Sequence, residues 1–201
     1  MAPVDDGRAG RSTRADGKAY RLRKRGRRIT VTSGMIVDVR EVAPADHKAV
    51  ARMMELYQHD FSEFDDHDLG ASGLYHYPDL ELYWSEPAYR AHVVTVAGKW
   101  AGFALSSDDV RCAGCERSLD EFFVVRKYRR RGVGQQVAMT LFDQIPARWE
   151  VRVHHRNAPA AAFWHKVVTA YTSGAFEDAR RTDDPWHRAI FTFQSRTALI
   201  G

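Results

Sequence analysis

Hydrophobic and polar positions follow regular patterns over most of the chain. Residues 36–42 are rich in β-branched side chains and predict a strand. Pro44 and Asp46 then open a helix whose apolar residues recur at spacings of three and four as far as Phe61. Residues 62–88 mix acids, Gly, Pro and aromatics, and predict loops with short helical pieces.

The second half of the chain alternates strand-like and helix-like segments. Because strand, helix, strand and helix follow one another over 119–168, we expect a parallel pair in the middle of the sheet. The fold class is therefore α/β, a mixed sheet with helices on both faces. The predicted elements are a hairpin of strands at 90–97 and 100–106, a strand at 119–125, a helix from 133 that ends before Pro146, a strand at 149–155, a helix at 157–168 capped by Asn157, and two strands within 170–193.

Length and composition fit an ordinary soluble domain. The chain has 201 residues, of which 44% are hydrophobic, enough for a real core. No apolar run approaches the ~18 residues of a membrane-spanning helix, and the first residues lack the apolar part of a secretory signal. Two cysteines cannot form a disulfide framework, which fits a reducing compartment. We therefore expect a cytoplasmic protein with no membrane partner.

Positive charge is concentrated at the N-terminus. Residues 1–33 hold ten Lys and Arg against three Asp, a net of +7, whereas the whole chain is +4, so residues 34–201 are close to −3. We interpret 1–33 as a basic, flexible arm, or as residues upstream of a natural start at Met35, and 34–201 as a single domain. The arm alone could contact nucleic acid electrostatically, an alternative that we rank below a solvated segment.

The most informative segment is the basic turn between residues 121 and 134. An apolar strand leads into three consecutive Arg, 129–131, and a helix begins at once. The first N–H groups of a helix have no intrahelical partners, and the helix dipole adds positive potential, so the turn suits phosphates. Gly132 and Gly134 let the backbone approach a ligand. The spacing is neither that of a Walker loop nor that of a dinucleotide fingerprint.

This setting resembles the GNAT superfamily of acyl-CoA-dependent N-acyltransferases, over about residues 35–195, as a stand-alone bacterial-type member of unassigned substrate. Four segments carry the likeness: Leu119-x-Glu121-Phe122-x-Val124 is similar to the family's cofactor-binding strand, Arg129-x-x-Gly132-x-Gly134 to its pyrophosphate loop, Val151-x-Val153 to the next strand, and Asn157-Ala158-Pro159-Ala160-Ala161-Ala162-Phe163-Trp164-His165-Lys166 to the helix written N-x-x-A-x-x-x-Y-x-K.

The resemblance implies the fold and the cofactor site. The fold would be a mixed, mostly antiparallel sheet of six to seven strands with a splayed parallel pair in the middle. Acetyl-CoA would be the co-substrate, with no metal. The backbone around Val124 and Val125 would hold the pantetheine arm, residues 129–134 the pyrophosphate, and Asn157 the region near the thioester. The cofactor-binding residues expected on this basis are Val124, Val125, Arg129, Arg130, Arg131, Gly132, Val133, Gly134, Gln135, Asn157 and Phe163.

Two catalytic roles also follow from the resemblance. Glu121 stands where many members place a general base that acts through water. Alternatively, Glu121 is half-exposed and pairs with an Arg of the loop. Trp164 occupies the position of the usual Tyr acid, but an indole N–H is not a usable acid at neutral pH. Tyr171 or a water could substitute.

The acceptor side is less defined. Residues 59–68 hold five carboxylates in ten positions and would give a negative rim that attracts a cationic amine. The alternative is a solvated helix end. The aromatic residues Tyr75, Tyr77, Tyr83 and Trp84 could line a pocket, although we favour cover for the sheet.

The sequence does not decide the roles of two further groups of residues. Cys112 and Cys115 form a lone C-x-x-C, which would be a zinc ligand pair between subunits, a redox pair or two unrelated thiols. The second group, His154 and His155, lies at a strand end near the expected site.

The sequence thus predicts an N-acetyltransferase that moves an acetyl group from acetyl-CoA to a primary amine by direct attack in a ternary complex. The acceptor would be a small cationic amine or a protein amine, and a homodimer is compatible with the fold. An alternative is a catalytically weak acyl-CoA-binding regulatory protein, and a third is a nucleic-acid-binding module that works through residues 1–33. Neither the acceptor nor the acyl chain length follows from the sequence.

Overall fold

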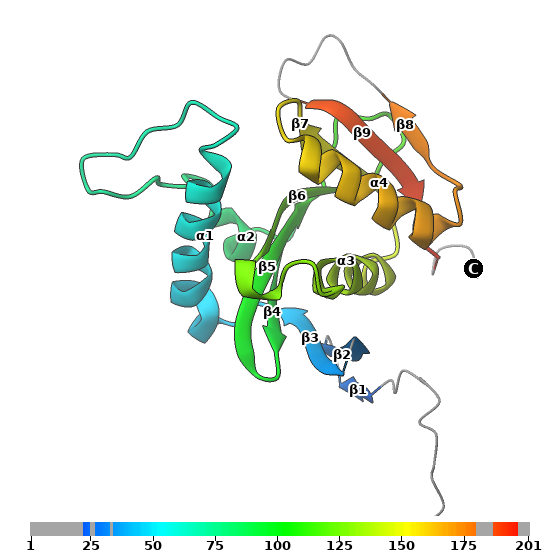
Figure 1. Ribbon diagram of the computed structural model, residues 1–201, viewed down its shortest axis with the longest axis horizontal. Coiled ribbons are helices and arrows are strands. Elements are labelled where there is room, and N and C mark those ends of the chain that lie inside the picture. Colours follow the sequence, from blue (N-terminus) through cyan, green and yellow to red (C-terminus); the bar gives the residue numbers. More distant parts are fainter. Residues whose placement is uncertain (1–21, 25–26, 33, 180–186, 197–201) are drawn as a thin grey trace, which may run out of the picture.

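A computed structural model describes residues 22–24, 27–32, 34–179 and 187–196 and arranges them around one sheet (Figure 1). The strand order is β1-β2-β3-β4-β5-β6-β7-β9-β8. The strands are β1 (Leu22–Lys24), β2 (Arg27–Thr32), β3 (Met35–Glu41), β4 (Tyr89–Val96), β5 (Lys99–Ser107), β6 (Arg117–Val124), β7 (Arg148–His154), β8 (Glu177–Ala179) and β9 (His187–Gln194). The helices are α1 (His47–Phe61), α2 (Leu82–Ser85), α3 (Val133–Gln144) and α4 (Ala158–Thr172), with 3₁₀ turns at Pro44–Asp46 and Arg126–Tyr128.

The expected parallel pair is β6 and β7, and it is splayed. Its ladder runs from Arg117 opposite Trp149 to Leu119 opposite Val151, and the two strands share no further register pair among the described residues. Beyond this point β6 pairs with β5, and β7 pairs with β9, both antiparallel. The two strands therefore separate toward their C-terminal ends, and the predicted fold class is confirmed.

The structure corrects two details of the predicted topology. The sheet has nine strands rather than six to seven, because residues 22–24 and 27–32, which the sequence analysis assigned to the arm, form β1 and β2. Residues 29–32 are Ile-Thr-Val-Thr, so β-branched residues favour a strand despite the surrounding charge. In addition, α4 continues to Thr172, which shortens the region left for the last two strands.

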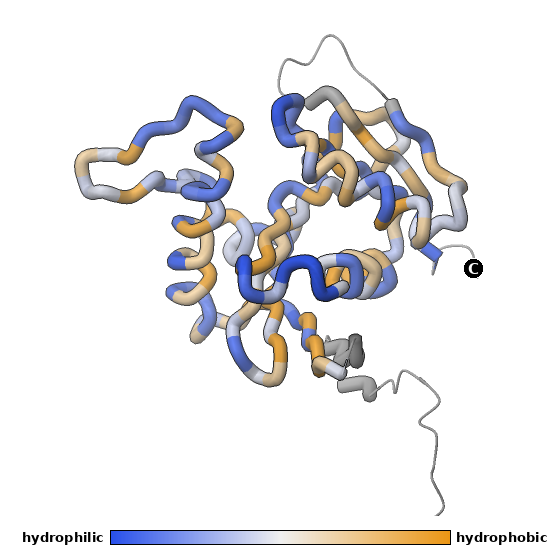
Figure 2. The backbone as a smooth tube through the Cα atoms, in the orientation of Figure 1, coloured by the Kyte–Doolittle hydropathy of each residue, from blue (hydrophilic) through white to orange (hydrophobic). Residues whose placement is uncertain are grey.

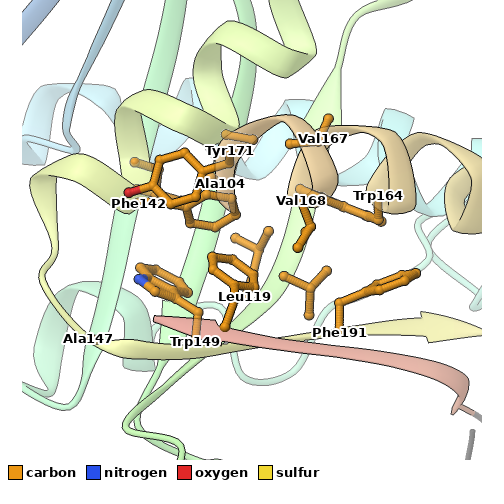
Figure 3. Close-up of a cluster of buried hydrophobic side chains, with 14 of the residues drawn as sticks. Ala104, Leu119, Phe142, Ala147, Trp149, Trp164, Val167, Val168, Tyr171 and Phe191 are labelled. Carbon is orange, nitrogen blue, oxygen red and sulfur yellow. The ribbon is translucent and has the colours of Figure 1, made fainter. Parts of the chain in front are cut away.

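Helices cover both faces of the sheet (Figure 1). Val50, Met53 and Met54 of α1 pack on one face, against side chains of β4, β5 and β6. On the other face, α3 and α4 enclose the largest apolar cluster, part of which is drawn in Figure 3. Its centre is aromatic: the ring of Phe142 lies 5.1 Å from that of Trp149 and 4.8 Å from that of Phe193.

None of the described helices has the length and apolarity needed to cross a membrane. The turn that precedes α3 is a hydrophilic stretch next to apolar β6 (Figure 2). The candidate site lies at this hydrophilic turn.

Candidate active site

A cavity of about 640 Å³ opens beside the end of β6, between α1 and α4. Four segments line it: the end of α1 and the residues after it (57–64), the end of β6 (122–124), the turn into α3 with its first residues (126–135), and the first half of α4 (157–167). Its ionisable lining comprises four cations and two carboxylates: Arg126, Arg129, Arg130, Lys166, Asp60 and Glu63. The cavity is therefore electropositive and suits an anionic ligand.

Most of the sequence-predicted residues meet in this cavity. The predicted residues that line it are Val124, Arg129, Arg130, Gly132, Gly134, Gln135, Asn157, Phe163 and Trp164. Four others, Glu121, Val125, Arg131 and Val133, do not line it. The structure thus assembles the turn, the strand and the helix that the sequence motif named, although it leaves some members of the motif outside.

The structure gives Val125 and Val133 other roles. The backbone N–H of Val125 donates to the carbonyl of Ala101 at 2.8 Å, and its own carbonyl accepts from the N–H of Tyr128 at 2.8 Å. Because an N–H donates one hydrogen bond, this N–H is not free for a pantetheine arm, whereas the carbonyl keeps a second lone pair that could accept from one. The side chain of Val133 is fully buried in the core beneath the turn.

The turn itself has the backbone shape of an anion site. Arg130 and Gly132 both adopt left-handed conformations, with φ of 58° and 78°, and Gly132 is the N-cap of α3. Successive N–H groups in such a turn point toward the same side and converge on a bound anion. The first amides of α3 add to them, since they lack intrahelical partners. This backbone fits a phosphate or pyrophosphate.

Gly134 also has a role in packing that the sequence did not indicate. A Cβ added at Gly134 would lie 3.2 Å from the ring of Phe163. Phe163 in turn stacks on Phe122, with 6.0 Å between ring centroids. A glycine at this position therefore allows α3 and α4 to approach each other, and the two phenyl rings form an apolar wall of the cavity next to the anion turn.

Arg129 spans the cavity rather than pointing freely into it. Its Nε donates to the carbonyl of Val124 at 2.6 Å, and its Nη2 donates to Asp60 at 2.5 Å. Arg126 also binds Asp60, at 2.5 Å. Burial opposes ionisation of Asp60, but the hydrogen bonds from Arg126 and Arg129 outweigh it and hold the pKa of this carboxyl below its ordinary value.

This bridge changes the interpretation of the acidic segment 59–68. Asp60 is paired with two arginines, so it neutralises part of the positive turn instead of attracting a cation. Sequence reasoning missed the pairing because the two partners are far apart in the chain. Of the other acids in the segment, Glu63 lines the cavity.

A β-bulge brings two carboxylates to one side of β6. Leu105 of β5 lies opposite Glu121, but its neighbour Ser106 lies opposite Leu119, so Asp120 is the extra residue. A bulge re-aims the side chains that follow it. As a result Asp120 and Glu121 both reach the tyrosines beside α1 and α2, and the Tyr83 hydroxyl donates to Asp120 at 3.0 Å.

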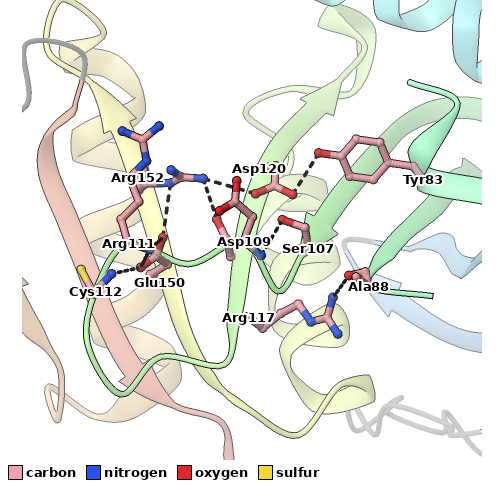
Figure 4. Close-up of polar contacts among 11 residues, drawn as sticks. Tyr83, Ala88, Ser107, Asp109, Arg111, Cys112, Arg117, Asp120, Glu150 and Arg152 are labelled. Atoms are coloured by element: carbon pink, nitrogen blue, oxygen red, sulfur yellow. Dashed lines mark hydrogen bonds and ion pairs between the residues drawn. The ribbon is translucent and has the colours of Figure 1, made fainter. Parts of the chain in front are cut away.

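Arg152 balances the charge of Asp120. Its guanidinium lies 3.5 Å from Asp120 and 3.4 Å from the fully buried Glu150, and it donates to the Ser118 hydroxyl at 3.1 Å (Figure 4). Because both strands of the splayed pair contribute to these contacts, the network stabilises the place where β6 and β7 begin to separate.

Glu121 has the properties of a proton acceptor. It is half-buried, and burial raises its pKa to about 7, although hydrogen bonding to Tyr57 and Tyr77 opposes the rise. Tyr57 lines the cavity, whereas Glu121 itself does not. No ion pair joins Glu121 to an arginine of the turn among the described residues, so the pairing considered from the sequence has no support there.

Trp164 lies at the cavity wall and is largely buried. Its ring packs edge-on against Phe122 at 5.0 Å and against Phe163 at 4.9 Å. Tyr171 cannot replace an acid here, because it is buried in the core and its hydroxyl binds Asp143 at 3.0 Å. His154 packs against Phe61 at 5.5 Å and lies outside the cavity lining.

The Asn157 side chain caps α4, since its Oδ1 accepts the N–H of Ala160 at 3.0 Å.

The aromatic residues of the segment after α1 mostly cover the sheet, as expected. Tyr77 and Tyr83 interact with the two carboxylates of the bulge, and the Trp84 indole donates to Glu81 at 2.7 Å. Sequence reasoning missed Tyr57 and Phe61 as cavity residues, because their helical spacing indicates a core face equally well.

Comparisons with known proteins agree with this geometry. Residues 50–168 match the model of the Acetyltransferase (GNAT) family. No curated protein matches the chain. Among solved structures, the chain is similar to an acetyltransferase from Thermus thermophilus (TM-score 0.57, 18% identity, 79% of this chain and 96% of that chain).

Two further structures are similar as well. One is the ribosomal-protein-S18-alanine N-acetyltransferase from Escherichia coli (TM-score 0.52, 18% identity, covering 79% of this chain and 94% of that chain). The other is Mycobacterium smegmatis RimJ in complex with CoA-disulfide (TM-score 0.59, 16% identity, covering 85% of this chain and 88% of that chain). At these identities the likeness concerns the fold.

Proposed function

The chain belongs to the acetyltransferase (GNAT) family and is an acyltransferase, and from that premise we propose that it transfers an acetyl group from acetyl-CoA to a primary amine. The anion turn at the cavity carries the proposal. Arg130 and Gly132 shape a nest of backbone N–H groups beside four cationic side chains, which suits the pyrophosphate of a CoA thioester. RimJ, whose fold is similar, is known in complex with CoA-disulfide.

The apolar part of the cavity would hold the remainder of the co-substrate. Phe122 and Phe163 form a wall between the anion turn and the end of β6, where the strands separate. A pantetheine arm is long and uncharged, and its methylene and dimethyl groups could pack on such a wall. Asn157 lines the same side. Acetyl-CoA, when bound, supplies an activated acyl carbonyl that an amine can attack directly.

Glu121 would accept the proton that the amine must lose before attack. A carboxylate whose pKa is about 7 is matched to this task near neutral pH. Because Tyr57 stands between Glu121 and the cavity, the proton would reach Glu121 through the Tyr57 hydroxyl or a water. Trp164 would shape the acyl site and exclude water, since its indole is not an acid at this pH.

The acceptor would be a small amine or a protein amine. The E. coli neighbour is an N-acetyltransferase of an alanine of ribosomal protein S18, so a protein N-terminus is one acceptor class to examine. The absence of a tyrosine at position 164 favours a second candidate, an acyl-CoA-binding protein with weak transfer. The two candidates predict the same cofactor binding and differ in turnover.

Calorimetric titration of acetyl-CoA tests the proposal. We expect micromolar binding by the wild type, about tenfold weaker binding by Arg130→Ala, which loses a cation at the cavity, and wild-type binding by Lys127→Ala. Lys127 is the matched control, because it lies in the same turn but does not line the cavity. Absence of binding by the wild type would contradict the proposal.

A thiol-release assay with spermidine, lysine and a peptide beginning with alanine then separates the two candidates. Release above the rate of acetyl-CoA hydrolysis supports the enzyme. Binding without such release from any of these amines favours the weak-transfer candidate.

A further inference from the structure

Cys112 and Cys115 lie in the loop between β5 and β6 and are the two cysteines of the chain. Both are thiols in the structure, and neither lines the cavity. No group of three His, Cys, Asp or Glu side chains within the described ranges could hold a metal ion. A role for Cys112 and Cys115 would therefore be independent of acetyl transfer in the cavity.

The two cysteines are the ends of one tight turn. The N–H of Cys115 donates to the carbonyl of Cys112 at 3.1 Å, and Gly114 has a φ of 81° at the third position. These are the features of a type II β-turn, in which the first and fourth Cα atoms lie less than about 7 Å apart. A disulfide bridges Cα atoms separated by about 4.4–6.8 Å, so the turn brings both residues into the range of a disulfide.

Contacts to β7 hold the backbone of this turn in place. The N–H of Cys112 donates to the Glu150 carboxylate at 2.8 Å, and the N–H of Arg111 donates to the same group at 3.1 Å (Figure 4). On the other side, the N–H of Glu116 donates to the carbonyl of Arg148 at 2.8 Å. The main chain is therefore held on both sides, which keeps the two Cα atoms at the separation that the turn sets.

The two thiols differ in their surroundings. Cys115 is buried, with 9% of its surface exposed, and its Sγ donates to the carbonyl of Trp149 at 3.7 Å. Burial raises the pKa of the Cys115 thiol. Cys112 is half-buried. Since thiolate character and access control the reactivity of a thiol, Cys112 would react first with a reagent from solution.

We propose that Cys112 and Cys115 form a dithiol site for exchange with small-molecule disulfides such as glutathione disulfide. The Cys112 thiolate attacks one sulfur of the reagent, a Cys112–glutathione bond forms, and one glutathione thiolate leaves. Cys115 then loses its proton to solvent and attacks the Cys112 sulfur, the second glutathione thiolate leaves, and the turn is closed by a disulfide. Two protein thiols are oxidised, and one glutathione disulfide is reduced to two glutathione molecules.

Intact-mass analysis of the reduced full chain after incubation with glutathione disulfide tests the site. We expect the wild type to lose two hydrogens, with both thiols lost from a colorimetric thiol count. Cys115→Ser should accumulate one glutathione at Cys112, because the resolving thiol is gone. Cys112→Ser should react about tenfold more slowly than Cys115→Ser, because its remaining thiol is buried.

Three results would overturn the proposal. The first is a wild type that keeps both thiols, or retains glutathione, under conditions where the urea-unfolded chain closes its disulfide. The second is equal reaction rates for the two serine variants, provided that both melt as the wild type does. The third is a disulfide between two chains rather than within one, which non-reducing electrophoresis detects.

Discussion

Asp60 and Arg129 form an ion pair that ties the end of α1 to the turn before α3 across the cavity, with 2.5 Å between carboxylate oxygen and guanidinium nitrogen. Arg129 also rests over the ring of Phe123, 5.5 Å from its centroid, and bonds the end of β6. Arg129, the first residue of the Arg129-x-x-Gly132-x-Gly134 motif, therefore connects α1, β6 and the turn before α3. We expect phosphates to depend more on Arg130 and the backbone of the turn than on Arg129.

Removal of the Asp60 charge should weaken the fold and tighten anion binding. Asp60→Asn loses both ion pairs, and we expect the free energy of unfolding to fall by about 1 kcal/mol. The affinity for acetyl-CoA should rise about threefold, because one negative charge leaves the cavity and two arginines are released. Thermal denaturation and calorimetry measure the two effects. Asp66→Asn, an exposed acid of the same segment, should change neither; equal effects in both variants would mean a general charge effect.

Glu121 should make stability depend on pH between about 4.5 and 7. Burial raises the pKa of this carboxyl to about 7 from an ordinary value of 4.5, so in this window the folded chain binds more protons than the unfolded chain. The contribution of Glu121 to stability therefore falls as pH rises through the window and levels off above it, whereas buried His92, whose pKa burial lowers to about 4, contributes in the opposite direction.

Glu121→Gln should remove this contribution, leave that of His92, and unfold with a free energy about 1–3 kcal/mol higher than the wild type at pH 8. Urea titrations at a series of pH values measure the difference. Glu63→Gln, at an exposed position, is the control. A pH dependence unchanged by Glu121→Gln would mean that another titratable group, not Glu121, has the raised pKa.

Substitutions of Asn157 should separate its capping role from any contact with a ligand. Asn157→Ala loses the bond to the N–H of Ala160, and we expect a loss of about 1 kcal/mol in the free energy of unfolding. Asn157→Asp keeps an acceptor oxygen for the cap but loses the amide donor. If the donor contacts the co-substrate, Asn157→Asp will keep wild-type stability and bind acetyl-CoA more weakly. Wild-type affinity in that variant would restrict Asn157 to capping.

A methyl group at Gly134 should disturb the contact between α3 and α4. In Gly134→Ala the new Cβ meets the Phe163 ring at 3.2 Å, and because Ala is favoured over Gly in a helix by about 1 kcal/mol, we expect a net loss of no more than about 1 kcal/mol in stability. The double variant Gly134→Ala with Phe163→Leu should recover part of this loss, since the shorter side chain makes room. Chemical denaturation of both variants and of Phe163→Leu alone checks the coupling. Additive losses in the double variant would show that the two positions do not interact.

The sequence predicted the order of elements well where local patterns are strong. The strand at 119–124, the turn at 129–134 and the helix capped by Asn157 all lie where their spacing placed them, and they meet at one cavity. Their glycines, cap residue and apolar spacing act over a few residues, so a single sequence carries the information.

Long-range pairings could not be predicted in the same way. The Asp60–Arg129 bridge joins residues that only the tertiary fold brings together. Local charge therefore allowed both a negative rim at residues 59–68 and an unpaired Arg129 that binds phosphate. The bulge at Asp120 is also invisible locally, because it depends on the register against β5. For the same reason Tyr171 was a plausible acid until α4 placed its hydroxyl on Asp143, in the core.

The short ladder between β6 and β7 has a consequence for the motion of the whole sheet. Three register pairs join β1–β6 to β7–β9, and among strands longer than the three-residue β1 and β8 this is the shortest ladder of the sheet, so the seam opens at a low cost in hydrogen bonds. The cavity lies beside the seam and is walled by β6 on one side and α4 on the other. A molecule that fills the cavity would therefore bridge both halves, and we expect amide hydrogen exchange along the seam to slow when it binds. A ligand in the cavity would thus increase the cooperativity with which the β1–β6 and β7–β9 parts of the sheet unfold.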